Sequence, residues 1–503
     1  MLTVSETEVV VVGAGPTGLM LAYELTLAGV ETLVLEKLPQ RIEQVKGGGI
    51  QPRTAELLDS RGLLEPLLMR ATSRDPVGGH FAALPVPLDC TPWNTRYPFP
   101  IAIPQWEIEE LLEGRAVAAG APVLRGTAVS GVEPDEEGVV VTADGLRVRA
   151  RYLVACDGGH STVRKLLGLP FPGRPGTHQA VLADIRLATV SPSVPRQLEH
   201  MSALMRRAGD YWAMLAPLGG DRYRFTFGRA DQPDTSRDTS RDTSGVTPEE
   251  ITVALQTVYG SGTTLGAVDN SSRFTDATRQ LEHYRAGRVL FAGDAAHIHP
   301  PLGGQGLNLG MQDSFNLGWK LAAAVQDRAP SGLLDSYHAE RHPVGAQVLH
   351  HTSAQRVLAD PNPGEDVAAL RDIFIDLLRL PDANRHVAGL MSGLSLRYEL
   401  SGGHPLTGHR VPDADLVTDA GPVRLSTLFA AGHAVLLDLT GTVPAGLGLP
   451  PRVDLVRATC AEDLGAAALL IRPDGYVRWA TDSSAVHASA LLAEIADTVA
   501  MVN

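Results

Sequence analysis

A glycine-rich segment near the N-terminus has the residue types and spacing of a phosphate-binding turn. Its chemistry-bearing residues are Gly13, Gly15, Pro16, Thr17 and Gly18. The apolar run at 8–12 predicts a buried strand before this turn, and residues 19–27 predict a helix after it. The glycines allow a tight turn, close approach of backbone N–H groups to a pyrophosphate, and close packing of helix on strand. We therefore expect an adenine dinucleotide at this turn.

An acidic residue follows at the spacing that a nucleotide-binding fold requires. Residues 32–35 predict a second strand that leads to Glu36, with Lys37 beside it in the expected cofactor site. The Glu36 carboxylate could accept hydrogen bonds from both hydroxyls of an adenosine ribose, and it would repel a 2′-phosphate. The tightly bound nucleotide is therefore predicted to be FAD or NAD rather than NADP. A glycine turn that binds no ligand is the alternative interpretation.

A second motif, far along the chain, distinguishes between these two cofactors. Residues 293–308 read GDAAHIHPPLGGQGLN, between a predicted strand at 285–292 and a predicted helix at 307–325. Asp294, at a strand end, can bind a polyol, and the free N–H groups of a helix N-terminus favour negative charge. A flavin needs both, because its ribityl chain is a polyol and its N1/C2=O edge gains negative charge on reduction. NAD has no such polyol, so the motif predicts FAD.

The composition excludes several function classes. A chain of 503 residues exceeds a single core of roughly 250 to 300 residues, so more than one domain is expected. A net charge of −14 without a basic block argues against a nucleic-acid partner. The cysteines Cys90, Cys156 and Cys460 form no CxxC pattern, so we expect neither a disulfide framework nor a thiolate metal site. We find no apolar run long enough to span a membrane and no export signal, so a cytoplasmic protein without a membrane partner is expected.

The periodicity of the chain predicts an α/β fold in three parts. A Rossmann-like FAD-binding domain is expected from discontinuous segments, 1–176 and 281–384, because both motifs must meet at one cofactor. Long alternating strands within 177–280 predict an α+β substrate-binding domain with a mostly antiparallel sheet. Part of the proline-rich segment 76–104 is expected to contribute to it. Residues 385–503 are expected to form a C-terminal domain.

Four shorter segments have their own predictions. Residues 234–244 read DTSRDTSRDTS, which predicts a surface loop, with a functional lid as the alternative. In the C-terminal domain, residues 434–437 predict a strand and residues 461–465 a helical stretch. Residues 467–479 predict a strand, a tight turn and a strand, without evident chemistry.

Three fingerprints together resemble those of a known family. They are GAGPTG at 13–18, DGGHSTVR at 157–164 and GDAAHIHPPLGGQGLN at 293–308. In these, over residues 8–345, the chain resembles the group A flavoprotein aromatic hydroxylases, the family of para-hydroxybenzoate hydroxylase and phenol hydroxylase. Within that family it is similar to the hydroxylases that tailor aromatic polyketides, such as aklavinone or anhydrotetracycline hydroxylases. The resemblance implies a C-terminal thioredoxin-like domain, which here lacks a redox cysteine pair.

The resemblance also implies roles for individual residues. Beyond Glu36, the cofactor contacts that it implies are Gln105, Asp157, Gly158, Asp294, Pro301, Gly304, Gly306, Leu307 and Asn308. Asp294 would bind the ribityl chain, and Asp157 with Gly158 would also take part in NADPH use. Pro301 would lie beside the flavin ring near the face that reacts with O2, and no catalytic acid or base is assigned. The backbone N–H groups of Leu307 and Asn308 would meet the N1/C2=O edge.

One segment departs from the pattern of the relatives. Where they usually have an arginine, this chain reads Lys46, three glycines at 47–49, and then Ile50 and Gln51. Consecutive glycines make a pliable backbone. The family moves its flavin between an inner and an outer position, and this loop could affect that motion.

Several of these residues have a structural alternative. Asp157 could cap a helix that starts near Ser161. His297 and His299 could be metal ligands, but no carboxylate or cysteine cluster accompanies them, so a turn-stabilising role is favoured and no metal is predicted. Arg164 could pair with an acid or contact the pyrophosphate.

Apolar positions on the predicted strands of the substrate-binding domain are the candidates for substrate contact. Trp212, Met214, Phe225 and Phe227 are core residues by default. If one face of that sheet covers a flat aromatic substrate, Trp212 and one of the two phenylalanines are expected to line it.

The expected reaction needs little acid or base from the protein. NADPH, or NADH, would reduce the flavin transiently, and O2 would then form a C4a-hydroperoxide whose distal oxygen an electron-rich ring attacks. We therefore predict an FAD-dependent, NAD(P)H-consuming monooxygenase that hydroxylates a polycyclic phenolic polyketide in antibiotic biosynthesis, as a monomer or weak homo-oligomer. Baeyer–Villiger oxygen insertion and drug inactivation are the alternatives. A non-catalytic binder is disfavoured, because it would not need Glu36, Asp157 and Asp294.

Overall fold

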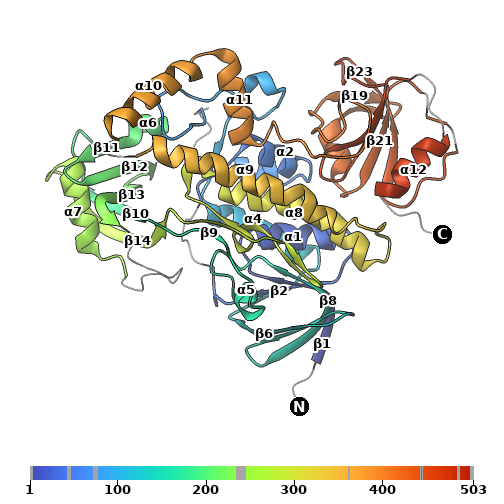
Figure 1. Cartoon of the computed structure of the whole chain (residues 1–503), viewed down its shortest axis with the longest axis horizontal. Coiled ribbons are helices and arrows are strands. Elements are labelled where there is room, and N and C mark those ends of the chain that lie inside the picture. The colour runs from blue at the N-terminus through green and yellow to red at the C-terminus, as the bar shows by residue number, and fades with distance from the viewer. Residues whose placement is uncertain are drawn as a thin grey trace.

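The computed structural model places three parts side by side (Figure 1). It describes residues 4–41, 47–71, 78–233, 245–360, 363–441, 443–444, 446–483 and 488–498. A central α/β part lies between a green antiparallel sheet on one flank and a red C-terminal part on the other. The predicted loop at 234–244 and Lys46 lie outside the described residues.

The central part is built on a mostly parallel sheet. Its strands run in the order β16-β17-β8-β1-β2-β5, with β6 and β7 paired beyond β8. Their bounds are β1 (Val4–Val12), β2 (Thr32–Glu36), β5 (Val123–Arg125), β6 (Val129–Pro134), β7 (Val139–Ala143), β8 (Leu146–Ala155), β16 (Arg285–Ala286) and β17 (Val289–Phe291). Strand β17 pairs in parallel with β8, although more than a hundred residues separate them. The sheet is therefore assembled from distant segments of the chain.

Two sequence predictions in this sheet need correction. The predicted strand at 285–292 is two short antiparallel strands, because the chain turns at Gly287, where φ is +59°. From the sequence, residues 146–150 and the apolar run from Tyr152 are expected to be two strands, but they form the single strand β8.

Helices cover this sheet and carry the expected cofactor turns at their N-termini. They are α1 (Pro16–Leu27), α2 (Pro52–Asp59), α3 (Leu64–Leu68), α4 (Gln105–Ala118), α5 (Thr162–Leu166) and α8 (Gly306–Val325). Helix α1 packs against both α4 and α8. Four consecutive residues of α1, Leu19 to Ala22, are fully buried, so this helix has no solvent-exposed face along that turn.

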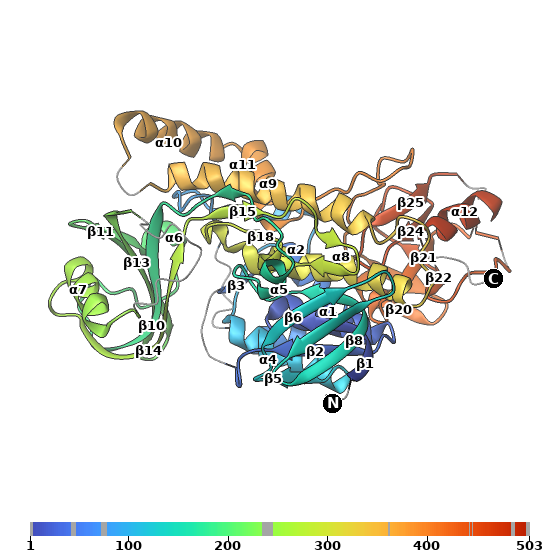
Figure 2. The same cartoon turned by 60° about the horizontal axis from the view of Figure 1, so that its bottom comes forward.

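The second sheet is wholly antiparallel. Its order is β11-β12-β13-β10-β14. The bounds are β10 (His178–Thr189), β11 (Met205–Ala208), β12 (Tyr211–Gly219), β13 (Arg222–Pro233) and β14 (Thr264–Thr275), with α6 (Met201–Leu204) before β11. Helix α7 (Pro248–Tyr259), which the sequence reasoning missed, covers the outer face, and the rest of the molecule lies on the other side (Figure 2).

Three further helices and two small sheets connect these parts. The helices are α9 (Ser336–Leu358), α10 (Glu365–Leu378) and α11 (Pro381–Ser392). The small sheets contain β3 (Gly49–Ile50) with β4 (Ile101–Ala102), and β9 (Gly173–Arg174), β15 (Thr278–Gln280) and β18 (His297–Ile298). Segment 78–94 packs under α9, α10 and α11, and the backbone carbonyl of Gly79 lies 3.3 Å from His200 Nε2, near α6.

The C-terminal part contains two sheets and one described helix. The first sheet is β20-β19-β23 and the second is β22-β21-β24-β25. The bounds are β19 (Asp415–Thr418), β20 (Gly421–Arg424), β21 (Ala434–Asp438), β22 (Val453–Arg457), β23 (Thr459–Cys460), β24 (Ala468–Ile471), β25 (Val477–Thr481) and α12 (Ala488–Thr498). This is the mixed sheet expected of a thioredoxin-like domain, and the hairpin β24–β25 was predicted. The helical stretch at 461–465 is wrong: Asp463 Oδ1 accepts the N–H of Gly465 at 2.8 Å, which makes a local turn instead.

The turn of that hairpin holds buried charges that the sequence did not reveal. Arg472 donates to Glu340 of α9 at 2.9 and 2.7 Å, and Lys320 of α8 lies 2.8 Å from the same carboxylate. Burial opposes ionisation of Glu340, yet Arg472 and Lys320 hold its pKa well below the ordinary value. Burial lowers the pKa of Lys320 to about 8. The C-terminal part is therefore anchored to α8 and α9 through ion pairs.

Within the described ranges, no helix combines the length and the apolar character that a membrane-spanning segment requires.

Candidate flavin and substrate site

The three glycines of the first turn do different work. At Gly13, φ is +105° and a Cβ would overlap the carbonyl oxygen of Cys156 at the end of β8. A Cβ on Gly18 would overlap the carbonyl oxygen of Gly13, so helix and turn could not pack. No atom of the described residues lies within 4 Å of the Cβ position of Gly15, at the N-terminus of α1. Two glycines therefore serve the fold, whereas Gly15 faces open space where a pyrophosphate fits.

The Glu36 carboxylate is fixed beside this turn. Its Oε2 accepts the backbone N–H of Ala14 at 2.8 Å, and its Oε1 accepts that of Leu38 at 2.9 Å. A carboxylate has about four acceptor sites, so each oxygen can accept another hydrogen bond. The side chain is half-buried, whereas Lys37 is exposed. Glu36 is thus oriented for a ribose, and Lys37 is left to interact with solvent or the outer part of a cofactor.

Thr17 joins the two motifs that are distant in sequence. A Cβ on Gly293 would lie 2.7 Å from Thr17 Oγ1, and a Cβ on Gly310 of α8 would overlap the same side chain. Ser314 Oγ donates to the backbone carbonyl of Thr17 at 2.7 Å. The start of α1 and the start of α8 are therefore in close contact, which puts both expected cofactor turns in one site.

Asp157 caps a helix and keeps one oxygen without a partner. Its Oδ2 accepts the N–H groups of Thr162 and Val163 at 2.6 and 3.2 Å, at the start of α5. Its Oδ1 is buried and has no hydrogen-bond partner among the described residues. Burial raises the pKa of this carboxyl group. The capping interpretation therefore holds, and the remaining oxygen is free for a ligand. Gly158 beside it has φ of +83° and open space around its Cβ position.

The turn that carries Asp294 is anchored from behind. The N–H of Gly293 donates to Asp313 Oδ2 at 3.1 Å, and the same carboxylate pairs with His297 at 2.8 Å and with Arg341 at 2.7 Å. Although burial alone would raise it, Arg341 and His297 hold the pKa of Asp313 below its ordinary value. Asp294 itself is exposed, as a polyol ligand requires. His297 thus stabilises the turn.

His299 has contacts of its own, separate from those of His297. Its Nδ1 lies 2.8 Å from the carbonyl oxygen of Pro300, and its Nε2 has no partner among the described residues. No group of three or more His, Cys, Asp or Glu side chains in the described part of the chain could hold a metal ion.

The N-terminus of α8 presents backbone N–H groups that have no hydrogen-bond partner within the helix. Gly303 and Gly304 have φ of +77° and +64°, and the helix starts at Gly306 without a side-chain cap. The first helical hydrogen bond is donated by Leu309 to Gln305 at 2.8 Å, so the N–H groups before it have no partner inside the helix. A helix N-terminus stabilises negative charge by roughly 1 kcal/mol. Pro301 and Gly304 are exposed beside it.

The side chain of Asn308 has a second role that the sequence reasoning missed. Its Oδ1 accepts the N–H of Gln51 at 2.7 Å, and its Nδ2 donates to the carbonyl oxygens of Gly49 and Gly304 at 3.1 and 2.9 Å. Asn308 therefore fastens the glycine loop at 47–51 to the α8 turn. In the sequence, its position as the third residue of the helix that follows the glycines could have indicated this role.

The three consecutive glycines pass through a narrow space. A Cβ on Gly47 would lie 3.4 Å from Gln105 Oε1 and from Leu307 Cδ1, and one on Gly48 would lie 2.8 Å from Arg224 Nη1. Gln105 is itself fixed by a 2.7 Å hydrogen bond to Glu109. The loop thus runs between α4, α8 and β13. The close approach of these elements is a second reason for glycine here, besides the pliable backbone that the sequence indicated.

The inner face of the antiparallel sheet carries an ion pair that the sequence did not single out. Arg224 donates from Nε to Asp184 Oδ1 at 3.0 Å and from Nη2 to Oδ2 at 3.3 Å. Asp184 is buried. On the same face, by strand register, lie Met214 and Trp212, whose indole packs on Gly228. The sequence pattern that could have revealed this pair is the presence of charged residues at alternate positions of otherwise apolar strands.

Phe225 and Phe227 lie on the opposite face from Trp212. They are 0% and 2% exposed and belong to the core beneath α7, with Ile251 and Leu255. The expectation that Trp212 and one phenylalanine line a common surface is therefore wrong, because side chains alternate along β13 and helix α7 covers the phenylalanine face. Both phenylalanines are core residues, as the alternative interpretation expected.

Arg164 forms no ion pair with an acidic side chain among the described residues. It donates to the carbonyl oxygens of Ala295 and Gly159 at 3.0 and 2.7 Å, and its guanidinium lies 3.8 Å over the ring of Phe171. It therefore ties the Asp157 turn to the Asp294 turn through backbone groups.

These features fit FAD. Three separate segments contribute to one site. They supply a carboxylate oxygen without a partner, an uncapped helix N-terminus and glycines that face open space. Comparison with known proteins agrees: residues 6–352 match the family described as FAD binding domain, and residues 404–500 match the one described as aromatic-ring hydroxylase, C-terminal. The chain belongs to this family of FAD-dependent aromatic-ring hydroxylases and is an FAD-dependent aromatic monooxygenase.

Several relatives cover nearly the whole chain. The 12-dehydrotetracycline 5-monooxygenase/anhydrotetracycline 6-monooxygenase of Streptomyces rimosus subsp. rimosus is 47% identical over 489 residues, 94% of this chain and 95% of the relative. A rifampicin monooxygenase of Streptomyces venezuelae is 43% identical over 94% of this chain and 95% of its own length. The solved structure of OxyS anhydrotetracycline hydroxylase from Streptomyces rimosus is similar with a TM-score of 0.89, at 44% identity, over 99% of this chain and 100% of that one.

Proposed function

We propose that this monooxygenase hydroxylates a polycyclic phenolic polyketide in antibiotic biosynthesis, with NAD(P)H as reductant. The observation that carries the proposal is the fixed Arg224–Asp184 pair on the sheet face that looks toward the flavin turns. The relative at 47% identity, named for dehydrotetracycline and anhydrotetracycline, supports the same substrate class.

Different residues of the cofactor site would bind different parts of FAD. Glu36 would bind the adenosine ribose, the start of α1 the pyrophosphate, and Asp294 the ribityl chain. Asp157 Oδ1 would accept a hydrogen bond from the cofactor or from NADPH. When bound, FAD supplies hydride acceptance and the activation of O2 for transfer of one oxygen atom. The N–H groups at the start of α8 would stabilise the negative charge of the reduced ring, and Pro301 would lie beside that ring.

The substrate side would orient an aromatic ring and keep water out. Trp212 and Met214 offer a flat apolar surface, and Arg224 offers a hydrogen-bond donor at its edge. Because Asp184 holds Nε and Nη2 of Arg224, Nη1 is directed at Gly48 in the glycine loop. A guanidinium held this way could donate to a phenolate or carbonyl oxygen, which favours the ionised, electron-rich ring. No nucleophile is required from the protein.

A second outcome within the same enzyme class is inactivation of an antibiotic by oxygenation. The similarity to the rifampicin monooxygenase at 43% identity favours it. The two outcomes differ in substrate and product and not in cofactor, so the fold does not distinguish them.

The test uses the purified protein with both substrate classes. We expect a yellow protein, and NADPH oxidation that accelerates on addition of a tetracyclic phenolic compound but not of rifampicin. NMR of the product should show a new hydroxyl on a ring carbon, since mass alone also fits ring expansion to a lactone. Acceleration by rifampicin alone would favour the second outcome, and a colourless protein that takes up no FAD would contradict both.

We also infer a cytoplasmic location, which supplies NAD(P)H, and a monomeric or weakly associated state. The three cysteines Cys90, Cys156 and Cys460 are free thiols, as a reducing compartment favours. Light scattering of the eluted protein would test the oligomeric state.

A further inference from the structure

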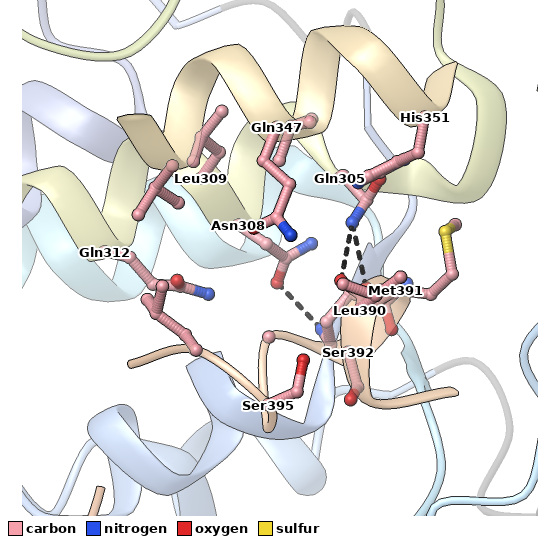
Figure 3. Close-up of a pocket in the computed structure, with 15 residues that line it drawn as sticks. Gln305, Asn308, Leu309, Gln312, Gln347, His351, Leu390, Met391, Ser392 and Ser395 are labelled. Carbon is pink, nitrogen blue, oxygen red and sulfur yellow. Dashed lines mark hydrogen bonds between the residues drawn. The ribbon is translucent and has the colours of Figure 1, made fainter. Parts of the chain in front are cut away.

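A polar pocket lies behind the turn that leads into α8. It is lined by the start of α8, the middle of α9 and the end of α11 (Figure 3), together with Gln51, and is partly open to solvent. Its polar lining consists of amide, hydroxyl and imidazole groups, from residues that include Gln305, Gln347, His351 and Ser395. Among the described residues, no Asp, Glu, Lys or Arg side chain lines it. The pocket therefore suits a neutral hydrogen-bonding molecule rather than an ion.

Two side chains in this pocket are more than nine-tenths buried and each has an unpartnered polar atom. Gln305 is 5% exposed, and it donates from Nε2 to the carbonyl oxygens of Met391 and Leu390 at 3.1 and 3.4 Å. Its Oε1 has no partner among the described residues. His351 is 8% exposed, and its Nδ1 has no partner there either. Figure 3 shows both side chains at the pocket. Buried polar atoms normally have partners, so each of these calls for a ligand atom.

The pocket has the size of a small water cluster. Its volume is about 40 Å³. A buried water needs roughly 10 to 15 Å³ of such space and two to four polar partners, so about three waters fit. An aromatic ring or a nicotinamide is too large.

The same pocket wall supports the turn expected to contact the flavin. Gln305 is the residue before the first helical residue of α8, and Gln51 Nε2 donates to the carbonyl oxygen of Gly303 at 3.0 Å. A Cβ on Gly303 would overlap the end of the Met391 side chain, so α11 packs directly against the turn. Residues 390–396 lie outside both matched family regions, 6–352 and 404–500. This connecting segment thus forms the back wall of the turn.

We propose that the pocket is a water site in which bridging water links Gln305 Oε1 to His351 Nδ1, and that both are positioning residues for the flavin-binding turn. The proposal rests on the placement of the flavin at the α8 N-terminus. The water would complete the hydrogen bonds that hold Gln305 between α9 and α11. The backbone of Gly303 to Gly306 would then keep the geometry that presents its N–H groups. Burial, with His299 and His350 nearby, lowers the pKa of His351 to about 4, so the imidazole is neutral and can accept or donate to water.

A double-mutant cycle tests this link. Gln305→Met and His351→Leu each remove one end of the bridge, and we expect each to weaken FAD binding five- to ten-fold and to shift the visible absorption maximum of the bound flavin. Because both act through the same water, the double variant should be no weaker than the worse single variant. Gln347→Met is the matched control, since Gln347 lines the same pocket but is exposed, and it should change the FAD dissociation constant less than two-fold.

Other outcomes of the same experiment overturn the proposal. Losses that multiply in the double variant, or single variants with wild-type FAD affinity and spectrum, would show that the two residues share no water. A purely structural role would lower the thermal midpoint of the FAD-free variants but leave the absorption maximum of the flavin that they still bind unchanged, and that result would also contradict the proposal. If a variant does not fold, a crystal structure of the wild-type holoenzyme decides: ordered water between the two atoms supports the proposal, and a dry pocket contradicts it. A wild-type protein without FAD would instead contradict the proposed function.

Discussion

The two sides of the proposed active site are built by different means. The flavin side uses backbone: glycines at positive φ, an uncapped helix N-terminus and carboxylates fixed by N–H groups. The substrate side uses side chains that alternate across a sheet, with Trp212 and Arg224 inward and Phe225 outward. A backbone site requires particular residues at particular positions, whereas a sheet face tolerates many side chains. This difference explains why the residues of the cofactor site could be identified from the sequence and those that contact the substrate could not.

The largest expected effect is a loss of stability that distinguishes the two faces of the antiparallel sheet. Phe225→Ala should lower the free energy of unfolding by about 3 to 5 kcal/mol, because it leaves a cavity under α7. Trp212→Ala, on the inner face, should cost less stability and raise the KM for the aromatic substrate. Chemical denaturation and steady-state kinetics measure both. A KM effect larger in Phe225→Ala than in Trp212→Ala would reverse our assignment of the faces.

The next largest effect is a difference in stability between substitutions of two glycines in the same turn. Gly13→Ala should destabilise the FAD-free protein by about 2 to 3 kcal/mol, since φ is +105° and the new Cβ meets the end of β8. Gly15→Ala should leave that stability within about 0.5 kcal/mol, because φ is −81° and its Cβ position is open. It should nevertheless weaken FAD binding. Equal FAD affinity of Gly15→Ala and wild type would mean that no pyrophosphate lies there.

A smaller effect tests the charged residue on the substrate side. Arg224→Met should raise the KM for a phenolic substrate roughly 10- to 100-fold, the equivalent of about 1.5 to 3 kcal/mol for a hydrogen bond to a charged group. Its FAD dissociation constant should change less than three-fold. Trp212→Phe is a suitable control, as it keeps an aromatic ring on the same face. An unchanged KM with impaired FAD binding would move Arg224 to the flavin side.

The smallest effect is a pH dependence on the flavin side. The pKa of Asp157 is raised in the folded protein, so between its unfolded and folded pKa values the native state binds more protons than the unfolded state. The contribution of Asp157 to stability is therefore full below the unfolded value of about 3.9 and decreases as pH rises through the folded value. The stability of the FAD-free wild type, compared with that of Asp157→Asn, should fall over this window. A constant difference would mean that Oδ1 is solvated and not orphaned.

The sequence predicted those elements whose local signals agreed with the fold. Gly13, Glu36 and Asp294 are in the expected turns because their backbone requirements are local. The face occupied by Phe225 could not be predicted, since it depends on α7, which the sequence reasoning missed. The predicted helix at 461–465 failed because the side chain of Asp463 satisfies the backbone in a turn. The burial of Arg472 and Gln305 depends on partners far along the chain, so no local pattern indicated it.

The most direct test is a crystal structure of the FAD-loaded protein with a polycyclic phenolic substrate bound. We predict the flavin N1/C2=O edge within hydrogen-bond distance of the N–H groups of Leu307 or Asn308, and the substrate between the flavin and the face that carries Trp212 and Arg224. A flavin remote from the α8 N-terminus, or a substrate that contacts neither side chain of that face, would contradict the account.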